Sequence, residues 1–204
     1  MIYKLVIKRL FDIVISFLGL ICISPLLLVV SLFIKFESRG SVLFYQTRLG
    51  KNGKEFRIIK FRTMCMNAEY IGDGLKIKSD SDSRITKVGN FLRKTSLDEL
   101  PQLFNILKGD MSLVGPRPPV HYFPYEGYGS YPEWAKKRFI IRPGITGLAQ
   151  CTVRNSVTWD ERIVLDIQYI DNLSFIMDLK IIYWTILRVL KSENIYLEKE
   201  KKDE

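Results

Sequence analysis

The longest apolar stretch of the chain lies near its N-terminus, where residues 13–34 carry no charged side chain. At about 1.5 Å per residue, a straight helix over these residues would be roughly 33 Å long, which is enough to cross a bilayer. Ser24-Pro25 interrupts the middle of the stretch. Proline lacks the amide that would bond the carbonyl of Ile21, and its ring crowds that carbonyl. The pattern predicts a helix that is broken or kinked at this dipeptide.

Three kinds of N-terminal segment fit part of this pattern. Each half of the stretch is roughly fifteen ångströms long, so a helix–break–helix would reach only the bilayer centre and return. Ser24 could bond the backbone group that the break frees, as a break inside a membrane requires. A kinked helix that spans the bilayer is the alternative. A cleaved signal peptide fits least, because the stretch is too long and no small-x-small site follows Ile34.

Positive charges flank the apolar stretch on both sides. The positive-inside rule gives a spanning helix no strong preference, whereas a re-entrant helix with both ends in the cytoplasm satisfies every flanking charge. Asp12 is unusual so close to an apolar run, and pairing with Lys8 or Arg9 on the preceding helical turn would neutralise it. The flanking cations are Lys4, Lys8 and Arg9 before the stretch, and Lys35 and Arg39 after it.

The rest of the chain alternates between strand and helix patterns. Residues 42–64 are rich in aromatic and branched side chains around Asn52-Gly53, which suits a type I′ turn, and predict a β-hairpin. A polar loop is expected at 70–84. Helices are expected at 87–94, from Pro101 to a cap at Gly109, at 159–169 and at 178–191. The predicted fold is mainly α with a small β-hairpin (α+β), divided into a re-entrant segment at 1–36, one domain at 37–192 and a charged tail at 193–204.

The last predicted helix has a single cationic edge. Lys180, Arg188 and Lys191 share one narrow face with Trp184, and the other sides are apolar or nearly so. The pattern is typical of a helix that lies in the headgroup layer, with its cations on anionic lipid. A core helix with one solvated edge is the alternative.

Composition narrows the partners and the chemistry. A net charge of +9 indicates an anionic partner, which could be nucleic acid, anionic lipid or a phosphorylated small molecule. Three widely spaced cysteines without a CxxC pair favour buried thiols in a reducing compartment. His121 is the sole histidine, and a structural role is expected for it. The chemistry of an enzyme with this composition would be carried by carboxylates and cations.

One carboxylate pair stands out, at Asp98 and Glu99. Ser96 followed by Glu99 matches a capping box, but Pro101 would then fall inside the helix, where proline costs about 3 kcal/mol. A helix that begins at Pro101 instead places both carboxylates just ahead of its N-terminus, a position that favours anions, including phosphate. Adjacent carboxylates also suit Mg²⁺, which takes one or two of them together with substrate phosphates. A carboxylate can itself attack phosphorus.

Several cations are candidates for binding phosphate. Prolines on either side of Arg117 (Gly115–Pro119) fix its backbone, and a guanidinium so fixed can grip a phosphate in bidentate fashion. The alternative is a surface turn with an incidental arginine. The Asp80-Ser81-Asp82 triplet has no preceding apolar strand and is interpreted as coincidence, and the chain lacks a GxGxxG or P-loop motif. Further candidates are Arg142 and Arg154 near glycine turns, and Lys60 and Arg62 in the hairpin.

Together these stretches resemble the bacterial sugar transferase family, the small monotopic phosphoglycosyl transferases. The resemblance covers nearly the whole chain, and its long central motif is highly specific. The matching stretches are KRLFD at 8–12, SP at 24–25, KFRTM at 60–64, RKTSLDELPQLFNILKGDMSLVGPRP at 93–118, RPGITGLAQ at 142–150 and DLKII at 178–182.

The resemblance implies a re-entrant helix broken at Ser24-Pro25 and catalysis at the cytoplasmic face of the bacterial inner membrane. It implies a Mg²⁺-dependent two-step transfer of a sugar 1-phosphate from a UDP-sugar to undecaprenyl phosphate, the first membrane step of glycoconjugate assembly. Asp98 then corresponds to the nucleophile and Glu99 to its partner. Arg93, Arg117 and Arg154 fall at positions associated with phosphate or nucleotide contacts. Expected partners are the UDP-sugar, undecaprenyl phosphate, membrane lipids and downstream glycosyltransferases.

The chain departs from the family pattern at two places, and two other functions stay open. Asp82-Ser83-Arg84 replaces the frequent Asp-Pro-Arg, and Val153 replaces a glycine before Arg154, which puts the role of Arg154 in doubt. A membrane-tethered basic protein would bind nucleic acid in a salt-dependent way. A catalytically inactive assembly subunit would keep the fold without turnover. The resemblance favours an enzyme that does not bind nucleic acid.

Overall fold

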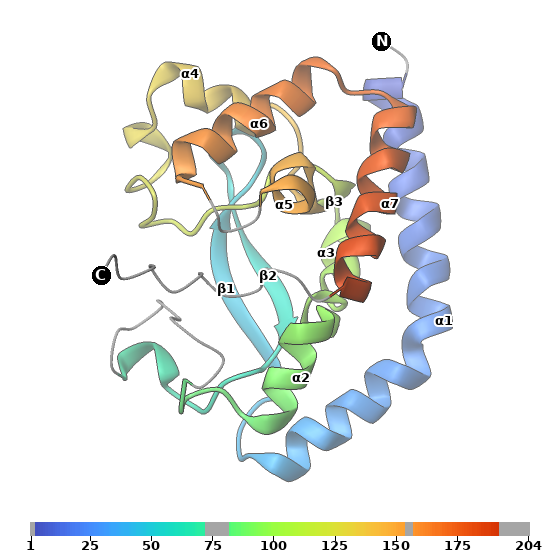
Figure 1. Cartoon of the computed structure of the whole chain (residues 1–204), viewed down its shortest axis with the longest axis vertical. Helices are drawn as coiled ribbons and strands as arrows, with labels where there is room; N and C mark the ends of the chain where they lie inside the picture. Colours follow the sequence, from blue (N-terminus) through green and yellow to red (C-terminus); the bar gives the residue numbers. More distant parts are fainter. Residues whose placement is uncertain (1–2, 72–81, 154–156, 192–204) are drawn as a thin grey trace, which may run out of the picture.

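The computed structural model describes residues 3–71, 82–153 and 157–191. It is mostly helical with two small two-stranded sheets, as the sequence predicted for the helices and the hairpin (Figure 1). The main elements are α1 (Lys8–Glu37), β1 (Leu43–Leu49), β2 (Glu55–Phe61), α2 (Lys87–Thr95), α3 (Gln102–Lys108), β3 (Ser112–Val114), α4 (Glu133–Lys136), β4 (Gly144–Thr146), α5 (Leu148–Thr152), α6 (Trp159–Asp171) and α7 (Phe175–Lys191).

Helix α1 is bent rather than interrupted. The helix continues through Ser24 and Pro25, so of the two predicted forms, a break or a kink, the structure shows a kinked helix, and the ribbon changes direction partway along (Figure 1). Proline is a common cause of such bends. The Ser24 hydroxyl donates to the carbonyl of Ile21 at 2.9 Å, the carbonyl that Pro25 leaves without its amide. The prediction that Ser24 bonds the backbone group freed by the proline is confirmed, and this hydrogen bond allows the helix to continue.

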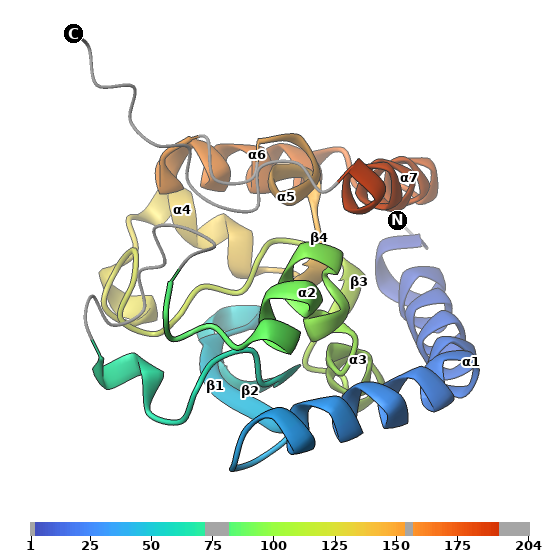
Figure 2. The ribbon, with the colours of Figure 1, turned by 60° about the horizontal axis from the view of Figure 1, so that its bottom comes forward.

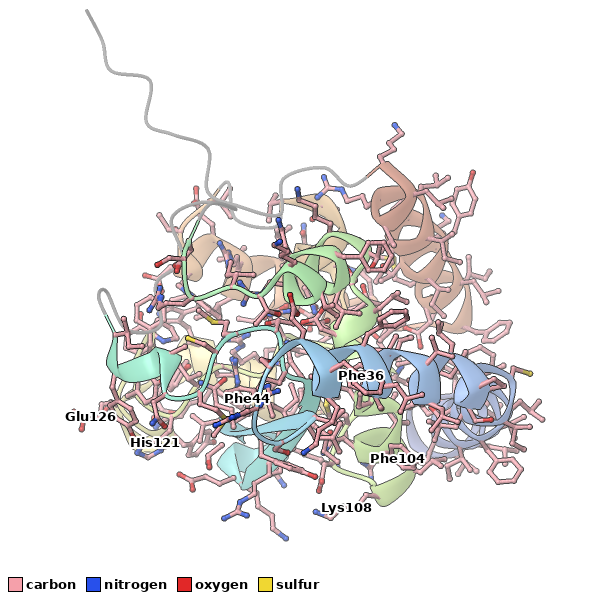
Figure 3. All side chains as sticks on the ribbon, turned by 90° about the horizontal axis from the view of Figure 1, so that it is seen from below. Phe36, Phe44, Phe104, Lys108, His121 and Glu126 are labelled. Carbon is pink, nitrogen blue, oxygen red and sulfur yellow. The ribbon has the colours of Figure 1, made fainter. Side chains whose placement is uncertain are left out.

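Helix α1 buries a narrow stripe and exposes the rest of its apolar surface. Among the described residues it is the one helix long and apolar enough to cross a membrane by length and composition, and 17% of its most apolar window is buried. Phe36 at the C-terminal end of α1 is 85% exposed, and Phe104 of α3 is 52% exposed. Figure 3 shows both on the same side of the molecule as Phe44 of β1.

The polar residues at the start of α1 contact the body of the protein. Lys8 Nζ lies 2.7 Å from Asp178 of α7, and Arg9 donates to the carbonyls of Ile106 and Leu107 at the end of α3. Asp12 accepts the amide of Leu113 at 3.1 Å. Among the described contacts neither Lys8 nor Arg9 forms a direct ion pair with Asp12, although the charges of both cations still act on its carboxylate, so the predicted pairing is present as electrostatic attraction while the direct contacts are tertiary.

The hairpin forms as predicted. Strands β1 and β2 pair antiparallel from Leu43↔Phe61 to Leu49↔Glu55. The turn has positive φ at Asn52 (55°) and Gly53 (73°), and the Lys54 amide donates to the Lys51 carbonyl at 3.1 Å. These are the features of a type I′ turn.

A second sheet, absent from the sequence-based prediction, joins two glycine-containing segments. Strands β3 and β4 pair in parallel through three residues each. A Cβ atom on Gly144 would lie 2.1 Å from the amide nitrogen of Gly115, and one on Gly115 would lie 2.5 Å from the carbonyl oxygen of Arg142. Only glycine allows this close approach. It fixes the chain immediately before Arg117.

Helix α7 closes the side of the domain beside the start of α1, as both ribbon views show (Figures 1 and 2). Its buried Asp178 also accepts hydrogen bonds from Tyr3 at 2.5 Å and Tyr169 at 2.6 Å. Large apolar side chains of α7 remain exposed, such as Ile176 at 65%. Arg188 donates to the Thr152 carbonyl, so the predicted row of three lipid-facing cations is wrong at this position.

We expect Asp178→Asn to destabilise the fold, because the buried Lys8 ammonium would lose its counter-charge. Removing one partner of a buried pair costs about 3–5 kcal/mol. Thermal unfolding of the purified protein should show a clearly lower midpoint. Glu133→Gln makes the same chemical change in the exposed Glu133–Lys136 pair and should leave the midpoint unchanged. Equal midpoints for the two variants would contradict the structural role of Asp178.

Candidate active site

Asp98 and Glu99 lie in a single 3₁₀ turn, Leu97–Glu99, between α2 and α3. Ser96 ends α2 with a left-handed backbone (φ 58°), and the Glu99 amide donates to its carbonyl, with no side-chain cap at Ser96. The capping box is therefore not formed. Pro101 leads into α3, which ends at Gly109 (φ 100°), as predicted.

Glu99 is held by two cations from different elements. Lys60 of β2 places its Nζ 2.6 Å from Glu99 Oε1, and Arg117 Nη2 lies 3.7 Å from the same oxygen. Burial opposes ionisation of this carboxyl, but Lys60 and Arg117 outweigh it and lower the pKa of Glu99 to about 2. Glu99 is thus a fixed anion.

Asp98 next to it titrates differently. Burial raises its pKa to about 6, against the attraction of Lys60 and with the repulsion of the Glu99 carboxylate added. At pH 7 Asp98 is mostly ionised, and it is more basic than an ordinary carboxylate.

Two predicted arginines flank the carboxylate pair. Arg93 at the end of α2 donates from Nε to Thr63 Oγ1 at 3.1 Å and contributes a positive field at Asp98. Arg117 follows the close contact of β3 with β4. The neighbouring Pro118 carbonyl accepts Arg48 Nη1 at 3.0 Å, which holds the arginine-bearing segment against the hairpin.

A buried asparagine fixes the carboxylate turn relative to Lys60. Asn105 of α3 is 1% exposed. Its side chain accepts the Ile59 amide at 2.9 Å and donates to the Arg57 carbonyl at 2.7 Å, so it pairs with β2 as a strand would. Lys60 is the next residue along that strand. The structure thus brings together Asp98, Glu99, Lys60, Arg93 and Arg117, all five of which the sequence singled out.

Sequence reasoning missed two residues beside this group. Arg48 of β1 and Gln102 of α3 line a small cavity together with Lys60, Glu99 and Arg117. The hairpin register carried a signal for Arg48, because Arg48 and Lys60 share a face of the sheet with the buried Phe56 and Ile58. Because Arg48 lies on the face of the hairpin that carries buried apolar side chains, its charge indicates a polar pocket on that face.

Other predicted binding residues lie elsewhere. Arg142 donates from Nε to the Gly109 carbonyl at 2.8 Å, at the opposite end of α3 from the carboxylates. Arg154 is outside the described residues. Arg62 donates to the carbonyls of Ser38 and Arg39, where it anchors the chain after α1. Asp82 pairs with Arg84 at 2.6 Å, and the other two residues of its triplet are outside the described part.

The carboxylate pair fits a magnesium ion only if phosphate completes the coordination. Within the described parts of the chain, no group of three or more histidine, cysteine, aspartate or glutamate side chains gathers. Asp98 and Glu99 supply two hard oxygen ligands, and Mg²⁺ commonly takes one or two carboxylates with substrate phosphates and water. Because Lys60 already pairs with Glu99 Oε1, Asp98 offers the less encumbered oxygens.

Comparison with known proteins gives a consistent picture. The model of the family described as "Bacterial sugar transferase" matches residues 3–192. EpsL of Bacillus subtilis strain 168, an uncharacterized sugar transferase, is 42% identical over 94% of this chain and 91% of its own length.

Two longer relatives carry more specific names. The UDP-N-acetylgalactosamine-undecaprenyl-phosphate N-acetylgalactosaminephosphotransferase of Aeromonas hydrophila is 43% identical over 90% of this chain and 44% of its own length. The UDP-glucose:undecaprenyl-phosphate glucose-1-phosphate transferase of Klebsiella pneumoniae is 43% identical over 95% of this chain and 42% of its own length. The chain thus spans less than half of these two proteins. With a family match over almost its entire length, it belongs to the bacterial sugar transferases.

Proposed function

We propose that this protein transfers a sugar 1-phosphate from a UDP-sugar to a polyprenyl phosphate and releases UMP. The names of the Aeromonas and Klebsiella relatives support this reaction. The observation that carries the proposal is the unequal carboxylate pair, in which Glu99 is held anionic by Lys60 and Asp98 keeps a pKa of about 6. A basic but mostly ionised carboxylate among cations is suited to attack phosphorus.

In the first step, an Asp98 oxygen attacks the β-phosphorus of the UDP-sugar. A bond forms between that oxygen and phosphorus, and the bond to the bridging oxygen breaks, so that UMP leaves with the electron pair. Negative charge on donor and nucleophile opposes this approach. Lys60, Arg93 and Arg117 offset that repulsion and stabilise the charge that develops on the phosphoryl oxygens.

In the second step, a phosphate oxygen of the lipid attacks the same phosphorus. The acyl phosphate bond breaks, Asp98 is regenerated as a carboxylate, and the product is a polyprenyl diphosphate sugar. A phosphate monoester with its second pKa near 6 is already largely dianionic at pH 7. The acceptor therefore needs no general base, which agrees with the surface position of His121 beside Glu55.

Magnesium is the cofactor that this chemistry calls for. Asp98 and Glu99 would hold it together with the substrate phosphates, where it would neutralise charge on the leaving group. The protein's own part is to keep the two carboxylates in one turn and to surround them with fixed cations.

The site fits a membrane surface. The exposed apolar sides of α1 and α7 support burial in lipid, with α1 re-entrant and both of its ends at the cytoplasmic face of the bacterial inner membrane. This would hold the carboxylates at the level of the lipid phosphate. The product would pass to downstream glycosyltransferases. An inactive assembly subunit or a nucleic-acid-binding protein is less consistent with the unequal carboxylates.

Asp98→Asn should lower the turnover rate about a thousandfold or more, because an amide is a far poorer nucleophile than a carboxylate. No phosphosugar should become attached to this variant. The measurement is retention of label from a donor carrying ³²P in its β-phosphate, after denaturation. Asp171→Asn, in the surface pair with Lys137, makes the same change away from the site and should retain the label. Labelled Asp98→Asn protein would refute the nucleophile assignment.

The carboxyl of Asp98 should titrate near pH 6, and its pKa should fall when Glu99 is replaced by Gln. That replacement removes the repelling carboxylate and frees Lys60 and Arg117 to favour the ionised form of Asp98. Infrared difference spectra recorded against pH, with Asp98→Asn identifying the band, measure this directly. Glu55→Gln is the control and should leave the midpoint in place. An unchanged or raised midpoint in Glu99→Gln would contradict the electrostatic account.

Both ends of α1 should be reached from the cytoplasm. In a variant whose native cysteines are replaced, single cysteines at Lys4 and Arg39 should resist a membrane-impermeant maleimide in intact spheroplasts and react after lysis. Lys108→Cys, on the exposed side of α3, reports the position of the catalytic domain. Reaction of Lys4→Cys from outside, with Arg39→Cys protected, would establish a spanning helix instead.

A further inference from the structure

The cavity beside the carboxylate pair is rich in hydrogen-bond donors. It opens between the inward face of the hairpin, the first residue of α3 and the segment after β3 (Figure 2 shows these elements together). Glu99 is its one carboxylate, and that group is already paired with Lys60. The polar lining consists of Arg48, Lys60, Glu99, Gln102 and Arg117.

Two donors in this lining have no partner in the described structure. Gln102 is 2% exposed, and its Nε2 is buried without a hydrogen bond. Arg48 uses Nη1 on the Pro118 carbonyl and Nη2 on Gln46, while its buried Nε is unpaired. Leaving a buried donor unsatisfied destabilises a fold. Both residues line the same cavity, so a ligand bound there could supply the missing acceptors.

The charge of the lining indicates the sign of that ligand. Arg48, Lys60 and Arg117 face a single carboxylate. Burial, with the nearby Arg117 guanidinium added, lowers the pKa of Arg48 to about 10. Positive charge is therefore in excess, and an anion with several acceptor oxygens would relieve both the repulsion and the unmet donors.

We propose that Arg48 and Gln102 complete an anion subsite that binds a phosphoryl group of a substrate next to Asp98. Glu99 and Gln102 are three residues apart and line the same cavity, one helical turn from the nucleophile. The inference rests on the proposed function for its substrates, which offer two sources: the diphosphate of the nucleotide sugar and the phosphate of the lipid acceptor. Arg48 also positions Arg117 through the Pro118 carbonyl.

Gln102→Leu tests the subsite without metal or turnover. The full-length protein is titrated with inorganic pyrophosphate in the presence of EDTA, by calorimetry. A hydrogen bond to a charged group is strong enough that its loss should weaken binding by about tenfold or more. The melting temperature should be unchanged or higher, because an unpaired buried donor is removed. Gln168→Leu, at an exposed position on α6, should leave the affinity unchanged.

Gln102→Glu provides a second variant of nearly the same shape. A carboxylate in the cavity should repel pyrophosphate and reduce binding below that of Gln102→Leu. Unchanged affinity in a folded Gln102→Leu or Gln102→Glu protein would overturn the subsite. Weaker binding of pyrophosphate would support the subsite even if no covalent intermediate were found on Asp98. The subsite and the covalent mechanism can therefore be refuted separately.

Single-turnover kinetics of Gln102→Leu distinguish the two sources. Slower release of UMP in the absence of lipid acceptor, with normal transfer from labelled enzyme, assigns the subsite to the donor diphosphate. A normal first step with slow transfer to the lipid assigns it to the acceptor phosphate. Normal rates in both steps at subsaturating substrate would contradict the inference.

Discussion

The ion pair between Glu99 and Lys60 makes two adjacent carboxylates chemically different. Without this ion pair, the two carboxyl groups would lie in similar surroundings, and their mutual repulsion would raise the pKa of both. With Lys60 on Glu99 Oε1 at 2.6 Å, Glu99 carries a permanent charge and Asp98 bears the cost of burial beside it. The pair therefore offers one carboxylate that is anchored and one that is basic enough to react.

The fold serves to keep that ion pair in place. Asn105 locks α3 to the edge of β2, so the turn before α3 and the lysine on β2 cannot move independently. The close contact of Gly115 with Gly144 fixes the approach to Arg117. Asp12 joins the apolar helix to the start of the same segment through the Leu113 amide. Asp12 thus ties α1 by one hydrogen bond to the segment that leads to Arg117.

Local signals allowed most helices, the hairpin and the core of the site to be predicted. Proline at 101, glycine at 109 and the Asn52-Gly53 turn each act within a few residues, and the structure follows them. Contacts between residues far apart in the sequence could not be predicted from such local signals. Asp12 was assigned to its helical neighbours, but Lys8 reaches Asp178, 170 residues away. Arg142 was a candidate for binding phosphate because it is a cation near a glycine turn, but its guanidinium donates to the Gly109 carbonyl at the end of α3.

Two kinds of feature could not be predicted from the sequence: very short strands, and residues whose role depends on which face of their element points inward. Strands β3 and β4 are three residues long, too short for any periodicity. Arg48 looks like a surface cation until the hairpin register places it beside Phe56. Gln102 follows a helix-starting proline and looks like an ordinary helix former. The tertiary structure shows that both donors line one cavity with Glu99.

The central claim is that phosphorus becomes bonded to Asp98 before the lipid acceptor takes part. Isotope exchange tests it directly: purified enzyme is incubated with UDP-sugar, labelled UMP and Mg²⁺ in the absence of polyprenyl phosphate. The account predicts that label enters the UDP-sugar, because the first step reverses through the enzyme-bound phosphosugar. Exchange that appears only when the acceptor is present would show a single ternary-complex transfer and contradict it.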